Sequence, residues 1–129
     1  MRRVVITGLG IVSSIGTNKE AVLASLKAGP SGISANADMA EHGFRSQVAG
    51  AIDLNPADHI DKRTLRFMGP GSAYAYIAME QAIADAGLTD ADVINPMTGL
   101  IAGSGGPSTS AMLAAHQTVL KTGATKRIG

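Results

Sequence analysis

The chain contains no cysteine and no tryptophan among its 129 residues, and only 3% of them are aromatic. Without cysteine it cannot build a disulfide framework, a thiolate zinc site or a cysteine nucleophile from its own residues. An excess of one charge is absent too, because 11 Lys and Arg residues nearly balance 10 Asp and Glu residues, for a net charge of +1. Neither nucleic acid nor a membrane is therefore expected as a partner, and an electrostatic partner must be sought in local clusters.

Long hydrophobic runs are also missing. The apolar stretch near the amino terminus gives way to polar residues too soon for a signal peptide or a membrane span. We therefore expect a cytoplasmic location. The apolar content of 45% is nevertheless ample for the core of a globular domain covering residues 1–129.

Glycine, by contrast, is plentiful, and it follows two apolar runs. Val4, Val5 and Ile6 precede a glycine-rich turn, and residues 99–103 precede a second one. Such runs predict buried strands of an α/β protein, in which functional loops follow the strand ends. The first turn nearly matches a dinucleotide-binding fingerprint, but Ser13 stands where the third glycine belongs. A nucleotide-binding α/β domain is thus a weaker alternative.

Capping signals and apolar spacing predict the remaining elements. We expect a helix from near Asn18, with a Thr17/Glu20 capping box and Gly29 as its stop. A short strand is expected around 47–49 and a short helix over 58–68. A helix from a Ser72 cap to Ala86 is apolar on most sides, so we expect it to be buried. Thr89 or Asp90 is expected to cap a short turn. A last helix should run through Met112 and His116 and stop at Gly123.

Candidate chemical groups are few. His42, His59 and His116 have no partners at metal-ligand spacing, so we expect no metal site and no cofactor. Lys62, Arg63 and Arg66 fall on one side of the short helix expected over 58–68. This cluster is either a solvated helix face or a docking site for an acidic partner.

Five blocks in order resemble a known family: RRVVITGLGIVSSIG over 2–16, SGI over 31–33, DKRTLRFM over 61–68, MEQAIADAGL over 79–88 and GLIAGSGGPS over 99–108. Together they resemble the amino-terminal part of the β-ketoacyl-acyl carrier protein synthases, above all the type I enzymes of bacterial fatty-acid synthesis. The resemblance implies a thiolase-like layered α/β architecture and a homodimer. This chain would hold only the first part of the amino-terminal βαβαβ half.

Enzymes of this family extend acyl chains by decarboxylative condensation with malonyl-acyl carrier protein, using a cysteine nucleophile, two histidines and a lysine. No residue of this chain matches those groups, so we expect the second half and the catalytic residues to lie outside it, and the chain alone to be inactive. The alternative is a non-catalytic module that binds carrier protein or a synthase.

Binding residues do match the family. The resemblance implies that Lys62, Arg63, Arg66 and Lys126 face the acidic acyl carrier protein. It also implies that Gly105, Gly106 and Pro107 line the pocket for the acyl chain near the dimer interface, although Pro107 replaces a glycine common there. Malonyl and acyl thioesters would be the substrates.

Overall fold

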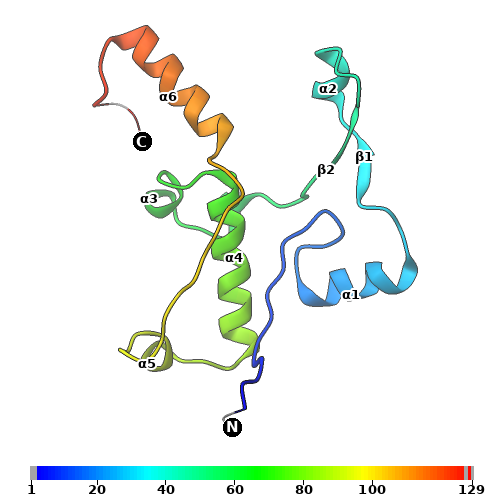
Figure 1. The fold of residues 1–129 in the computed structure, drawn as a ribbon, viewed down its shortest axis with the longest axis vertical. Helices are drawn as coiled ribbons and strands as arrows, with labels where there is room; N and C mark the ends of the chain where they lie inside the picture. The colour runs from blue at the N-terminus through cyan, green and yellow to red at the C-terminus, as the bar shows by residue number, and fades with distance from the viewer. Residues whose placement is uncertain (1–2, 127, 129) are drawn as a thin grey trace. The chain divides into compact units, whose positions relative to one another are not determined.

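The computed structural model describes residues 3–126 and 128 (Figure 1). The elements are α1 (Lys19–Ala28), β1 (Ile33–Ala35), α2 (Ala37–Glu41), β2 (Val48–Gly50), the 3-10 turn η1 (Pro56–Asp58), α3 (Lys62–Leu65), α4 (Pro70–Asp85), α5 (Asp90–Val93) and α6 (Thr109–Thr122). They fall into two compact units. The first comprises Met1–Asn55 with Ala78–Leu88, and the second comprises Pro56–Ile77 with Thr89–Gly129, so α4 contributes to both.

Helix α1 of the first unit forms as predicted but is capped one residue later. The Asn18 side chain, rather than Thr17, accepts a hydrogen bond from the Ala21 N–H at 2.8 Å. Asn is as good a cap as Thr, so the Thr17/Glu20 box was wrong by one position. Gly29 ends the helix with a left-handed φ of 78°, as predicted, and its N–H donates to the Ser25 carbonyl.

A small antiparallel sheet follows α1. Its register pairs Ile33 with Gly50 and Ala35 with Val48. The predicted strand around 47–49 is thus confirmed within one residue. Strand β1 was missed, because three residues are too few to display an alternating pattern.

The two buried strands predicted at 4–6 and 99–103 do not form. Val4 is 95% exposed and Ile101 is 99% exposed. A strand needs a neighbouring backbone for its N–H and C=O groups, and the only sheet among the described residues is β1–β2. The two runs are apolar as predicted, but no strand of the described residues pairs with either of them.

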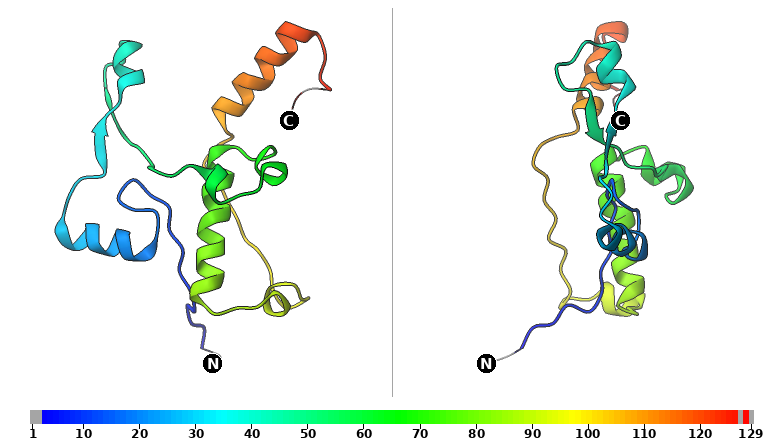
Figure 2. Two further views of the ribbon diagram at one scale, coloured as in Figure 1. Left: turned by 180° about the vertical axis from the view of Figure 1, so that it is seen from behind. Right: turned by 90° about the vertical axis from the view of Figure 1, so that its right-hand side faces the viewer.

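The amino-terminal segment instead lies against the carboxyl half of α4, beside which it runs in Figures 1 and 2. A Cβ on Gly10 would stand 1.8 Å from the Ala78 carbonyl oxygen, and one on Gly8 would stand 2.2 Å from that of Ala82. Both distances are far below van der Waals contact. These glycines therefore serve a close backbone-to-helix approach.

Side chains of α4 also replace part of the missing strand pairing. The Leu9 N–H donates to an Asp85 carboxylate oxygen at 3.0 Å, and the Ile11 N–H donates to Gln81 Oε1 at 3.0 Å. Gln81 Nε2 in turn donates to the Thr17 carbonyl at 2.7 Å. The segment is thus fixed to the helix by hydrogen bonds as well as by close packing.

In the second unit the helix predicted over 58–68 is broken into η1 and α3, because the Asp61 side chain caps a new helix start. Helix α4 begins at Pro70 rather than after a Ser72 cap. Proline suits a first helical position, where its missing N–H would have no partner in any case. The Ala73 N–H donates to the Gly69 carbonyl and closes the first turn.

The predicted end of α4 is confirmed, since Gly87 has a left-handed φ of 66°. Its predicted burial is wrong: Ala73 and Ile77 are buried, whereas Tyr76 and Met79 are exposed. An all-round apolar helix needs covering elements on every side. Within the described residues, the other elements cover only the stripe of α4 that holds Ala73 and Ile77.

The last two helices are confirmed. Thr89 rather than Asp90 is the cap of α5, and its N–H donates to the Asp92 carboxylate at 2.8 Å. Gly123 ends α6 with a φ of 64°. None of the helices in the described ranges combines the length and the apolar character that crossing a membrane requires.

Candidate functional site

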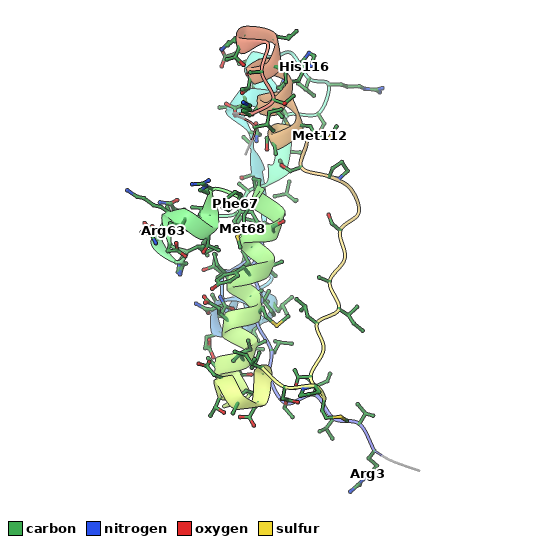
Figure 3. All side chains as sticks on the ribbon, turned by 90° about the vertical axis from the view of Figure 1, so that its left-hand side faces the viewer. Arg3, Arg63, Phe67, Met68, Met112 and His116 are labelled. Atoms are coloured by element: carbon green, nitrogen blue, oxygen red, sulfur yellow. The ribbon has the colours of Figure 1, made fainter. Side chains whose placement is uncertain are left out.

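The three predicted basic residues lie together on one turn of the second unit, which we call the basic turn: Lys62, Arg63 and Arg66. Helix α3 carries the first two, and Arg66 follows as its cap, with its N–H donating to the Lys62 carbonyl at 3.3 Å. All three side chains are exposed. Figure 3 labels Arg63 on the outer side of this turn.

Asp61 fixes the start of the basic turn. One of its carboxylate oxygens accepts hydrogen bonds from the N–H groups of Arg63 at 2.9 Å and Thr64 at 3.2 Å. Hydrogen bonding from the Thr64 side chain and from these amides holds the pKa of Asp61 below its usual value. The carboxylate is therefore engaged by the helix start, and the three cations remain exposed.

A hollow of about 290 Å³ lies beside the basic turn. We call it the α6 hollow. Its lining comes from the residues after α3 and from one side of α6: Arg66, Phe67, Met68, Gly69, Ala111, Ala114, Ala115, Thr118 and Ile128. The Arg66 guanidinium carbon stands 4.4 Å from the centre of the Phe67 ring. The apolar part of this surface was not predicted, although Phe67 and Met68 directly follow the basic residues in sequence.

Lys126, the fourth predicted basic residue, is exposed in the turn after α6. It is two residues from Ile128, which lines the α6 hollow, so their Cα atoms are within about 7 Å of each other. The structure thus brings Lys126 close to the hollow on whose edge Arg66 lies.

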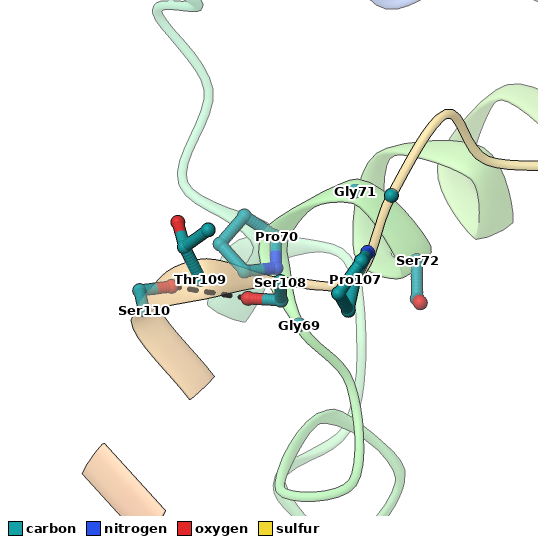
Figure 4. A pocket seen from close by; sticks show the side chains of 9 residues that line it. Gly69, Pro70, Gly71, Ser72, Pro107, Ser108, Thr109 and Ser110 are labelled. Carbon is teal, nitrogen blue, oxygen red and sulfur yellow. Dashed lines mark hydrogen bonds between the residues drawn. The ribbon is translucent and has the colours of Figure 1, made fainter. Parts of the chain in front are cut away.

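A second hollow, of about 360 Å³, lies where α4 and α6 begin (Figure 4). Gly106 and Pro107 line it, whereas the third predicted pocket residue, Gly105, does not. The remaining lining is Gly69, Pro70, Gly71, Ser72, Ser108, Thr109 and Ser110. This lining of glycine, proline and hydroxyl residues is smaller and more polar than the wall of an acyl-chain pocket is expected to be.

Ser108 organises this second hollow. It caps α6 by accepting from the Ala111 N–H at 3.3 Å, and its hydroxyl lies 3.1 Å from that of Ser110. A Cβ on Gly69 would come within 2.8 Å of the Ser108 Cβ, so glycine is needed there for the two segments to meet. The hollow is therefore held in shape by one close contact and one helix cap.

The histidines are divided between the two units. His42 lies on α2's end with its Nδ1 2.8 Å from the Asp38 carbonyl, while His59 and His116 are exposed in the second unit. Among residues 3–126 and 128, no group of three or more His, Cys, Asp or Glu side chains is arranged to hold a metal ion.

Comparison with known sequences places these features in a family. Residues 1–128 match the model described as "Beta-ketoacyl synthase, N-terminal domain". The 3-oxoacyl-[acyl-carrier-protein] synthase 1 of Haemophilus influenzae is 54% identical over 129 residues, covering 100% of this chain and 32% of that protein. The Escherichia coli protein of the same name is 55% identical over 109 residues, covering 84% of this chain and 27% of its own length.

Solved structures agree. A β-ketoacyl synthase from Burkholderia phymatum has a TM-score of 0.77 at 30% identity, covering 100% of this chain and 32% of that one. The ishigamide ketosynthase/chain length factor has a TM-score of 0.79 at 30% identity, covering 97% of this chain and 31% of that one. The predicted thiolase-like α/β class is thereby confirmed, with the described residues forming part of it. The chain spans about a third of the length of these relatives, and it belongs to the β-ketoacyl synthase family, whose amino-terminal domain it matches over residues 1–128.

Proposed function

We propose that this chain is part of a type I 3-oxoacyl-[acyl carrier protein] synthase, an acyltransferase that lengthens acyl chains by decarboxylative condensation with malonyl-acyl carrier protein. The observation that carries this proposal is the 54% identity over all 129 residues to a protein with that name. The nucleophile has to come from residues outside this sequence, which contains no cysteine.

The role proposed for the basic turn, with Lys126, is to dock the acidic carrier protein. Its support is the exposure of Lys62, Arg63 and Arg66 on one short turn, with the neighbouring Asp61 engaged by backbone amides. Exposed cations of this kind raise association rates and select acidic partners, and salt screens their effect.

The role proposed for Gly105, Gly106 and Pro107 is to line the acyl-chain pocket. Gly106 and Pro107 border the hollow at the start of α6, and the glycines leave room beside the backbone. A polar hollow is a poor acyl pocket by itself, so the proposal requires apolar walls from residues outside this sequence. A homodimer and a cytoplasmic location belong to the same proposal.

The test uses the complete gene product that contains these residues. Its mass is measured first, followed by labelling with a thiol-directed condensing-enzyme inhibitor and by condensation of an acyl-enzyme with malonyl-acyl carrier protein. We expect a chain about three times this length that is labelled and active. A product that binds carrier protein but is neither labelled nor active favours the non-catalytic module.

Charge reversal then tests the docking role. Arg63→Glu combined with Arg66→Glu is expected to raise the KM for malonyl-acyl carrier protein at low salt about tenfold or more, with a smaller effect at high salt. Lys27→Glu combined with Arg45→Glu, at two exposed cations of the first unit, is the control with the same change of net charge and should leave KM unchanged. Equal effects from both changes would refute a docking site on the basic turn.

A further inference from the structure

Arg66 differs from an ordinary surface cation because an aromatic ring supports it. Its guanidinium carbon is 4.4 Å from the centre of the Phe67 ring, within the range of a cation–π contact. An arginine side chain has many rotamers in water, and ordering it on binding opposes association. A ring that already holds the guanidinium in place removes part of that entropy loss.

The backbone at Phe67 is fixed by hydrogen bonds. The Phe67 N–H donates to the Thr64 carbonyl at 3.2 Å, and the Met68 N–H donates to the Leu65 carbonyl at 3.0 Å. These bonds close the turn after α3 and fix where both side chains leave the backbone. In Figure 3, Phe67 and Met68 follow Arg63 where the chain turns toward α4.

The α6 hollow places an apolar surface next to this supported cation. Ala111, Ala114 and Ala115 of α6 line it with small apolar side chains, together with Phe67 and Met68. Among the described residues of its lining, Arg66 is the only charged one. A ligand that combines a carboxylate with an adjacent apolar side chain complements this lining.

We propose that Phe67 is a positioning residue that holds Arg66 at the edge of the α6 hollow. An acidic helix of the carrier protein then pairs a carboxylate with Arg66 and inserts one neighbouring apolar side chain into the hollow. This inference rests on the proposed function and deepens it, because it adds an apolar recognition element to a charged one.

Charge argues for a carrier protein as the occupant rather than an apolar segment of the same polypeptide. A segment that covered the hollow permanently would also cover Arg66, and a buried cation without a carboxylate partner is strongly unfavourable. An acidic helix supplies that partner when it binds and leaves the guanidinium in water when it departs.

The test measures the affinity of the complete gene product for a fluorescently labelled holo-acyl carrier protein, by anisotropy at several salt concentrations. Phe67→Leu should weaken binding about two- to fivefold without changing the salt dependence, because no charge is removed. Phe67→Tyr should restore the affinity, because it restores the ring. Arg66→Gln should weaken binding and also reduce the salt dependence.

The double variant tests whether Phe67 acts through Arg66. If it does, Arg66→Gln with Phe67→Leu should bind no more weakly than Arg66→Gln alone. Losses that multiply, or a Phe67→Leu variant that binds like the unmodified protein, would overturn the positioning role. Phe67→Met is a second replacement if the leucine variant has a lowered Tm.

Filling the hollow tests its occupant. Ala115→Leu should weaken carrier binding while leaving the Tm of the free protein unchanged, and Gln117→Leu, on an exposed part of α6 outside the lining, should do neither. A lowered Tm with unaltered binding would show that the protein's own chain fills the hollow and would overturn the inference. If the unmodified protein does not bind carrier protein at all, both the proposed function and this inference fail. If it binds, but substitutions at Phe67 and Ala115 do not change the affinity, only this inference is overturned.

Discussion

In the first unit the amino-terminal segment lies directly on α4, with its glycines close to the helix backbone and its N–H groups bonded to Gln81 and Asp85. In the second unit, the residues around α3 and the start of α6 leave two hollows, edged by hydroxyl groups and by Arg66. Close packing fixes a backbone path, while a hollow with polar edges leaves room for a ligand. The first region is therefore packed as a scaffold, and the second has room for the binding proposed above.

The glycines of the two regions illustrate this difference. A Cβ on Gly8 or Gly10 would overlap α4, whereas a Cβ on Gly105 or Gly106 would meet no atom within 4 Å in the described structure. Glycine thus follows two similar apolar runs for different structural reasons. Contacts within the chain require the first pair, and only a ligand or further protein would require the second.

The largest expected effect comes from Gly10→Ala. The new Cβ overlaps the Ala78 carbonyl, so the segment must move away from α4, and overpacking of this kind costs about 1–3 kcal/mol or more. Gly71→Ala is the matched control, because its Cβ has open space and alanine is the better helix former. Urea denaturation should show the first variant to be destabilised and the second to be unchanged or stabilised.

A smaller loss is expected from Gln81→Leu. It removes the acceptor of the Ile11 N–H and the donor to the Thr17 carbonyl, and leaving such partly buried groups unpaired costs about 1–3 kcal/mol. Glu80→Leu, at an exposed neighbouring position, is the control. Equal denaturation midpoints for the two variants would contradict the role given to Gln81.

The ion pair between Lys19 and Asp85 should produce a still smaller, pH-dependent effect. The hydrogen bond from Lys19, together with that from the Leu9 N–H, holds the pKa of Asp85 below its usual value. A carboxyl group whose pKa is lower in the folded state stabilises that state. The stabilisation is complete when the pH is above the pKa of the unfolded state, and it is lost as the pH falls through the pKa of the folded state. The Tm difference between the unmodified protein and Asp85→Asn should thus be constant near neutral pH and shrink below about pH 4. A difference that grows on acidification would contradict this assignment.

The smallest change in stability is expected for Gly105→Ala. Its Cβ meets nothing in the described structure, so the free energy of unfolding should change by less than about 0.5 kcal/mol. If this segment lines the acyl pocket, the same variant should alter the preferred acyl length, measured as condensation rates over a series of acyl-carrier proteins. A large loss of stability would show that Gly105, like Gly8 and Gly10, is needed for close packing within the protein.

Local signals predicted the helix ends well. Gly29, Gly87 and Gly123 each end a helix in the left-handed conformation, which depends only on a few neighbouring residues. Helix starts were predicted less well, since Asn18 and Pro70 act where Thr17 and Ser72 were expected. Several adjacent residues can cap a helix equally, and their contacts with the rest of the chain decide among them.

For the candidate site, the basic residues could be read from the sequence, but the apolar surface beside them could not. Lys62, Arg63 and Arg66 lie within one turn, so helical spacing alone groups them. Phe67 and Met68 line the same hollow as Ala111 and Ala114, which follow more than forty positions later in the sequence, and no local period connects such residues.

The sequence by itself determined the family, the helix ends and the basic turn, because these depend on residue identity and on short-range spacing. Only the tertiary structure decided that Gly8 and Gly10 serve a close approach to α4, that the runs at 4–6 and 99–103 are not strands among the described residues, and that Arg66 rests on Phe67 beside a hollow. Pairing and packing join residues far apart in the chain, so their outcome depends on which partners are present in space.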